Sequence, residues 1–137
     1  MLHLLDRCQR VCYTNEVFYH YMKRVDGSSI TTAAFSEKRL AWVKHCRDNF
    51  AFIKEKYSEL KADAAARYRS SILWTLREIC LLDSGLEDDW KQLRQELRQN
   101  FGLFWREAGL RNRILMILLG YAPRGLLHGL FEKRRKV

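Results

Sequence analysis

Residues 84–104 read SGLEDDWKQLRQELRQNFGLF. Apolar residues recur every three or four positions along this stretch, which is typical of a helix with one buried face. They are Leu86, Trp90, Leu93, Leu97, Phe101 and Phe104. Ser84 and Glu87 match the capping-box pattern S-x-x-E, so the sequence predicts a long amphipathic helix that begins at this serine.

The same helical period continues on both sides of this stretch. Two earlier stripes consist of Val43, Cys46, Phe50, Ile53 and Tyr57, and of Ala65, Tyr68, Ile72, Leu76 and Ile79. A weak break between them is expected at residues 57–61. Gly109 is expected to end the long helix, residues 111–119 to form a short apolar helix, and Pro123 to open a last one.

Length and composition agree with a helical globular fold. A chain of 137 residues fits one domain with its own core. It is 47% hydrophobic and 30% charged, which is far from the composition of disordered chains. One proline and seven glycines are too few for the turns of a many-stranded sandwich or barrel. We therefore predict a mainly α fold, with an amphipathic helical bundle over residues 35–137.

The first 34 residues follow a different pattern. Residues 2–9 carry a short helical stripe, and a period of two follows at Val11, Tyr13, Val17, Tyr19 and Tyr21. Turn-forming residues stand at 14–16 and 26–29. This pattern predicts a helix and a pair of short strands, a β-hairpin-like segment that precedes the bundle.

Positive charge is concentrated near the C-terminus. The formal net charge is +9, and residues 106–137 contain eight Lys or Arg residues but only two acids. An anionic membrane surface, a nucleic acid or a sugar-phosphate ligand is an expected partner, and a solvated tail without a partner is the alternative. No nucleic-acid-binding motif accompanies the charge, which disfavours nucleic acid.

Neither a membrane span nor a signal peptide is evident in the sequence. The longest apolar run, residues 114–119, is far shorter than the roughly 20 residues that cross a bilayer. Residues 1–7 lack the ordered zones of a signal peptide, so we expect a cytoplasmic protein. The four cysteines show no CxxC pair, which favours reduced thiols over a metal site.

One segment combines residues that bind phosphate. The sequence lacks GxSxG, HExxH, a Gly-rich phosphate loop and an Asp-x-Asp pair. Residues 17–24 alternate aromatic side chains and end in two cations, and a glycine-hydroxyl loop follows at residues 26–31. Such cations and loop N–H groups are donors for phosphate oxygens. An ordinary turn after a strand is the alternative explanation.

These residues resemble part of a known family. Residues 2–16, 18–24 and 27–31 read LHLLDRCQRVCYTNE, FYHYMKR and GSSIT. They resemble the end of the catalytic domain of bacterial family 2 glycosyltransferases, where a helix and a short strand lead into a Tyr-x-Tyr-x-x-Arg strand and a Gly-Ser-Ile loop. Residues 35–137 look like the variable helical C-terminal extension of those enzymes.

The resemblance implies part of an inverting, nucleotide-sugar-dependent glycosyltransferase of surface polysaccharide assembly. In such an enzyme Arg24, Ser28 and Ser29 would contact the region of the sugar-nucleotide diphosphate. Tyr19 and Tyr21 would form walls of the site for the glycan acceptor.

The resemblance also implies a divalent metal, Mn or Mg, bound with the donor. His20 is the candidate ligand in this chain, and a solvent-facing strand histidine is the alternative. The family's nucleotide-sugar domain, its Asp-x-Asp metal motif and its Glu-Asp pair with the catalytic base are missing from this sequence. We therefore expect a C-terminal fragment that is inactive alone, with Met1 an internal methionine.

The C-terminal residues support an alternative function, a helical interaction module that docks on anionic membrane surfaces. The cations Arg124, Lys133, Arg134, Arg135 and Lys136 flank an apolar face made of Leu126, Leu127, Leu130 and Phe131. This is the composition of an interfacial helix. The two functions are compatible. The competing structural explanation is that this apolar face packs back on the bundle and leaves only the terminal cations exposed.

Overall fold

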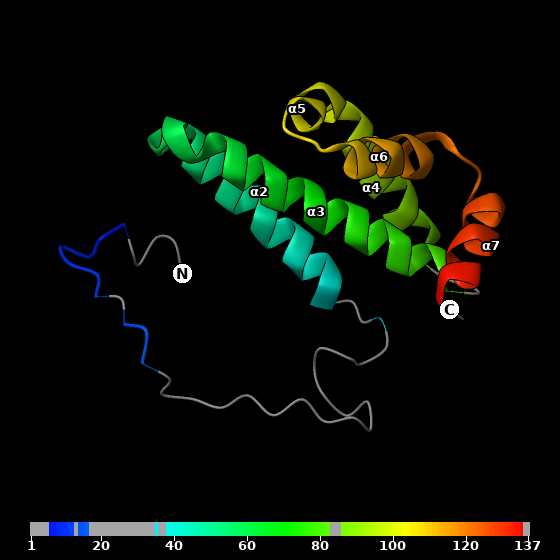
Figure 1. Ribbon diagram of the computed structural model, residues 1–137, viewed down its shortest axis with the longest axis horizontal. Helices are drawn as coiled ribbons and strands as arrows, with labels where there is room; N and C mark the ends of the chain where they lie inside the picture. Colours follow the sequence, from blue (N-terminus) through cyan, green and yellow to red (C-terminus); the bar gives the residue numbers. More distant parts are fainter. Residues whose placement is uncertain (1–5, 13, 17–34, 36–37, 83–85, 136–137) are drawn as a thin grey trace. The chain divides into compact units, whose positions relative to one another are not determined.

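The chain divides into two compact units, residues 1–34 and residues 35–137. The computed structural model describes residues 6–12, 14–16, 35, 38–82 and 86–135 (Figure 1). The described residues of the first unit form turns and irregular backbone, in which the Glu16 N–H donates to Thr14 Oγ1 at 3.1 Å.

The predicted β-hairpin-like segment falls mostly outside the described residues. Residues 6–9 form a turn and a bend, so they are not the end of a helix. Val11 and Cys12 are not part of a strand. Short isolated strands are marginal without a sheet to join, which accounts for irregular backbone at this point. The remainder of the predicted segment, with Tyr19 and Tyr21, lies outside the described residues.

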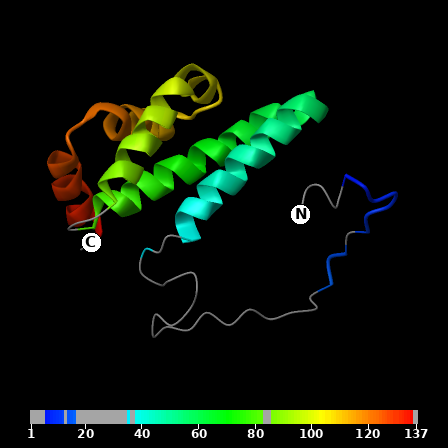
Figure 2. The same cartoon turned by 180° about the vertical axis from the view of Figure 1, so that it is seen from behind.

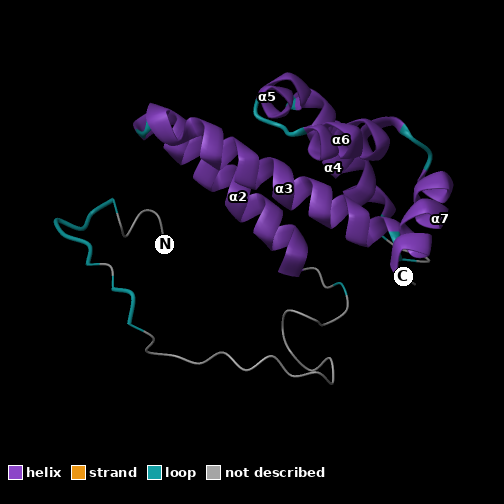
Figure 3. Ribbon diagram, in the orientation of Figure 1, coloured by secondary structure: helices purple, strands orange, loops and turns teal. Residues whose placement is uncertain are grey.

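The second unit is a helical bundle (Figure 3). Its described residues contain no strand, which confirms the predicted mainly α class. Its helices are α2 (Lys38–Lys56), the 3-10 helix η1 (Ser58–Leu60), α3 (Lys61–Cys80), α4 (Glu87–Gln99), α5 (Phe101–Arg106), α6 (Leu110–Tyr121) and α7 (Arg124–Arg135).

Helix α3 is the centre of the bundle. It contacts α2, α4, α5, α6 and α7. Helices α2 and α3 lie side by side in both views, and α4 to α7 gather along the rest of α3 (Figures 1 and 2). Because neighbours surround it, α3 buries Ile72, Leu76 and Ile79 completely. Each further α-helix adds to this core, through Val43, Leu97, Phe104, Met116, Leu119 and Leu127.

Most predicted helix boundaries are confirmed. The break expected at residues 57–61 is the 3-10 helix η1, in which the Leu60 N–H donates to the Tyr57 carbonyl. Gly109 lies in the break before α6 with an extended backbone, although the preceding helix α5 already ends at Arg106. The Leu127 N–H donates to the Pro123 carbonyl at 3.2 Å, so the first turn of α7 starts at this proline.

The helix predicted for residues 84–104 is two helices. The first of them, α4, begins at Glu87, and its N-cap position is Leu86, at a positive φ of 58°. The predicted cap, Ser84, lies outside the described residues. Helix α4 ends at Gln99, and the side-chain amide and backbone N–H of the next residue, Asn100, both donate to the Glu96 carbonyl. Asparagine competes for backbone hydrogen bonds in this way, which separates α4 from α5.

Arginines from other helices cap two helix C-termini. Arg94 and Arg98 of α4 donate to the Gly120 carbonyl at 2.8–3.2 Å, at the end of α6. Arg124, the first residue of α7, donates to the carbonyls of Ile79 and Leu82 at 3.0 and 3.1 Å, at the end of α3. Cations are favourable at helix C-termini, where carbonyl groups lack partners. These contacts fix α6 and α7 on the bundle.

Candidate functional site

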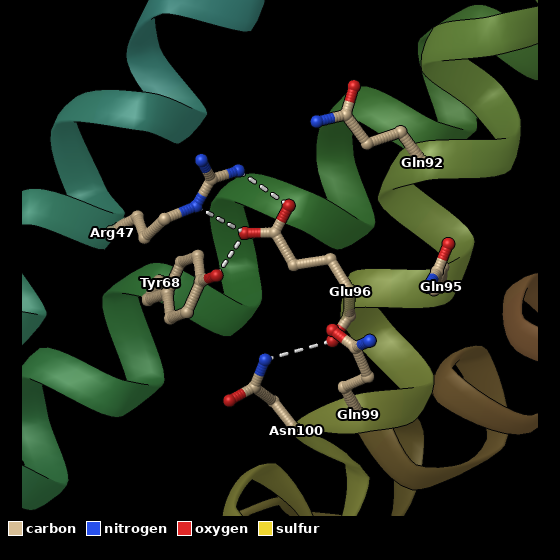
Figure 4. Close-up of a pocket in the computed structure, with 7 residues that line it drawn as sticks. All are labelled: Arg47, Tyr68, Gln92, Gln95, Glu96, Gln99 and Asn100. Atoms are coloured by element: carbon tan, nitrogen blue, oxygen red, sulfur yellow. Dashed lines mark hydrogen bonds and ion pairs between the residues drawn. The ribbon is translucent and has the colours of Figure 1, made fainter.

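A polar groove lies between α2, α3 and α4 (Figure 4). Its volume is about 450 Å³, and every residue that lines it is polar. They are Arg47, Tyr68, Gln92, Gln95, Glu96, Gln99 and Asn100. The three glutamines recur at helical spacing along α4, so their amides lie along one side of the groove.

Glu96 is the centre of this groove. It is only 9% exposed, because α4 turns it toward α3. The guanidinium of Arg47 binds its carboxylate in a two-pronged arrangement, Nε to Oε1 at 2.7 Å and Nη2 to Oε2 at 2.6 Å. The Tyr68 hydroxyl also donates to Oε1. Three helices therefore meet at one buried carboxylate.

The electrostatics of the groove follow from this contact. The hydrogen bonds to Glu96 raise the pKa of Arg47 further above its ordinary value. Burial, with the neighbouring Glu96 carboxylate, raises the pKa of Tyr68 to about 12. Both effects favour a charged Arg47 beside a neutral Tyr68.

The arrangement is that of a fixed ionic link and not of a general base. Both oxygens of Glu96 already accept hydrogen bonds from the protein. The side chain of Arg47 is 43% exposed, and only two of its five N–H donors are bonded to Glu96. It can therefore offer donors to an anion or a hydroxyl group at the mouth of the groove.

Alkaline unfolding tests the buried hydroxyl of Tyr68. A tyrosine in an unfolded chain has a pKa of about 10, below the folded value of about 12. The stability that Tyr68 contributes is therefore complete below about pH 10 and is lost as the pH rises toward 12, by up to about 3 kcal/mol. Urea unfolding across this range should show a steeper loss for the parent than for Tyr68→Phe. Equal slopes would contradict the assignment.

A second hollow, which we call the α6–α7 face, is largely apolar. Its volume is about 580 Å³, and α6, α7 and the end of α3 form its walls. The lining residues include Arg77, Leu110, Arg111, Ile114, Leu118 and Leu130. Leu110 is 76% exposed and Ile114 is 49% exposed, so large apolar side chains lie on the surface beside two arginines.

The structure corrects part of the predicted membrane contact on α7. Leu127 and Phe131 are buried in the core, because the apolar face of α7 packs against α3. The side chain of Arg124 is 19% exposed and is bound to Glu87 and to the end of α3. These three residues stabilise the fold and are not available for membrane contact.

The remaining predicted site residues divide into two groups. Leu130 and Lys133 are exposed on α7, and Arg134 and Arg135 belong to its last turn. The others lie outside the described residues: Tyr19, His20, Tyr21, Arg24, Ser28, Ser29 and Lys136.

The sequence did contain a signal for the polar groove that the sequence-based predictions missed. Glu96 stands next to Leu97, three residues after Leu93, and so falls on the buried side of α4. A charged residue in this position needs a partner when it is buried. The pattern does not identify that partner, because Arg47 is 49 residues away in the chain.

Comparisons with known proteins identify no relative. No family model, curated protein or solved structure matches the chain.

Two structural features are absent from the described residues. No three His, Cys, Asp or Glu side chains there are close enough together to hold a metal ion. None of the helices described is both long enough and apolar enough to cross a bilayer.

Proposed function

We propose that this chain is the C-terminal part of a nucleotide-sugar-dependent glycosyltransferase of surface polysaccharide biosynthesis, which acts in the cytoplasm. The observation that supports it is the sequence of residues 17–31, where alternating aromatics lead into cations and a Gly-Ser-Ser-Ile loop. The separate helical unit after residue 34 is consistent with an extension that follows a catalytic domain.

In this proposal the chain supplies binding groups and not the catalytic base. Arg24, Ser28 and Ser29 contact the donor's diphosphate region, and the tyrosines 19 and 21 border the glycan acceptor. A divalent metal, Mn or Mg, would neutralise the diphosphate, and His20 is the ligand that this chain would offer.

A transfer assay tests this proposal. The chain alone should transfer nothing from UDP-, GDP- or dTDP-sugars with Mn or Mg. The product of the reading frame extended upstream of Met1 should be active, and Arg24→Ala should lower its kcat/KM by about 10- to 100-fold, because a charge-assisted phosphate contact is lost.

The control variant is Lys44→Ala, an exposed cation of α2, which should leave activity unchanged. Turnover by the chain alone that disappears in Arg24→Ala would contradict the proposal. Full activity of Arg24→Ala in the extended protein would contradict it as well.

A second candidate function is favoured by the α6–α7 face. In this case the helical unit is an interaction module, with or without a catalytic domain attached. Monomeric proteins seldom expose large apolar side chains side by side unless the surface binds a partner.

A further inference from the structure

The exposed side of α6 is apolar along its whole length. Leu110, Ile114, Ile117 and Tyr121 follow one another at intervals of four, three and four residues, so they form one stripe. All four are at least 47% exposed. The opposite side of the helix, with Met116 and Leu119, is buried in the core. Helix α6 is therefore apolar on both sides. Within the exposed stripe, the Tyr121 ring meets the Phe101 ring edge to face at a centroid distance of 6.2 Å.

Cations accompany this stripe, and acids do not. Helix α6 contains Arg111 and Arg113 but no Asp or Glu. Arg77 reaches the same hollow from α3. Arg77 and Arg111 also line a neighbouring hollow with Trp74, which is 52% exposed. Positive charge thus lies between two exposed apolar areas.

We propose that the α6–α7 face binds the surface of an anionic lipid bilayer. An interfacial helix combines an apolar stripe, which enters the headgroup boundary, with cations that contact lipid phosphates. A half-exposed tryptophan beside it suits the same interface. A nucleic acid would use the arginines but would leave Leu110 and Ile114 without a role. This inference rests on the second candidate function and does not require the glycosyltransferase.

The orientation of the protein on the bilayer follows from which side chains are already buried in the core. Leu127 and Phe131 remain in the core, so α7 contributes Leu130 and the exposed Lys133. Contact along α6 therefore replaces insertion of α7, and the protein lies on the bilayer without crossing it.

Co-sedimentation of the full chain with vesicles tests the proposal. Vesicles of phosphatidylcholine with about a third phosphatidylglycerol should bind the chain, and pure phosphatidylcholine should bind it much less. Arg111→Glu should lower the partition coefficient about 25-fold, since one unit of charge at the surface is worth about fivefold and the change makes the charge two units more negative. Raising the salt from about 0.1 M to about 1 M should weaken binding, because the Debye length falls from about 10 Å to about 3 Å.

Matched variants test whether vesicle binding depends on this surface or only on the net charge and overall hydrophobicity of the protein. Lys44→Glu makes the same change of charge at an exposed residue of α2. It should change binding by less than about twofold relative to the parent, because salt screens a charge that is far from the bilayer. Ile114→Gln should reduce binding about fivefold or more, whereas Leu60→Gln, at a residue that is 46% exposed on η1, should not. Circular dichroism checks that each variant is folded.

The proposal would be overturned if the chain did not bind anionic vesicles, or if it bound neutral vesicles equally well. It would also be overturned if the two variants of each matched pair lost vesicle binding equally. Light scattering that shows a dimer dissociated by Ile114→Gln would assign the face to a second copy of the chain. Vesicle binding is read out without any sugar donor, so its failure is distinguishable from failure of the transfer assay.

Discussion

Replacing Phe104 by alanine should lower the free energy of unfolding by about 3–5 kcal/mol. Phe104 is fully buried, and its ring meets the ring of Tyr68 edge to face at a centroid distance of 5.3 Å. The Phe104 carbonyl also accepts a hydrogen bond from the buried Arg69 at 3.0 Å. The cavity would therefore lie where α3, α4 and α5 meet. Domains of this size are stable by about 5–15 kcal/mol, so the loss is large.

Urea unfolding followed by circular dichroism measures this loss. The control is Phe52→Ala on α2, which deletes the same atoms from a side chain that is only partly buried. It should cost about 1–2 kcal/mol, because less apolar area returns to water. Equal losses in the two variants would mean that α5 does not pack as described.

Replacing Glu96 by alanine should cost about 2–4 kcal/mol. The change leaves the Tyr68 hydroxyl and the Arg47 guanidinium without their acceptor. Breaking a fully buried pair costs about 3–5 kcal/mol, and the half-exposed Arg47 lowers that figure because water can replace the carboxylate there. Gln95→Ala, an exposed neighbour on α4, should change stability by less than about 0.5 kcal/mol.

A combined variant tests whether Glu96→Ala loses stability because Arg47 and Tyr68 are left without their acceptor. Arg47→Met, Tyr68→Phe and Glu96→Leu together remove every member of the network and keep similar volumes. This variant should be more stable than Glu96→Ala alone, because no polar group is left buried without a partner. A triple variant that is less stable than Glu96→Ala would contradict the explanation by unpartnered polar groups.

The helices could be predicted because their apolar periods are regular, but their ends depend on single side chains. The apolar period runs unbroken from Leu97 through Phe101 to Phe104, so hydrophobicity gives no sign of the interruption. The interruption arises from the amide of Asn100, which bonds back to the Glu96 carbonyl. Such a bond is visible only once the backbone is in place.

The surfaces were harder to predict than the helices. An amphipathic stripe looks the same in sequence whether protein or lipid covers it. On α7 the stripe is covered by the bundle, so Leu127 and Phe131 are core residues. On α6 almost every position is apolar, and the sequence cannot say which side is buried. Likewise, the partnership of Arg47 with Glu96 needs the tertiary fold to bring α2 next to α4.

Because Arg124 caps α3, helix α7 belongs to the same cooperative folding unit as α3. Cutting the protein before this residue would uncap the carbonyls of Ile79 and Leu82 and leave the Glu87 carboxylate without its cation. It would also remove Leu127 and Phe131 from the core. Shortened versions that omit α7 should therefore unravel at the α3 end, and a fusion partner should follow α7 instead of replacing it.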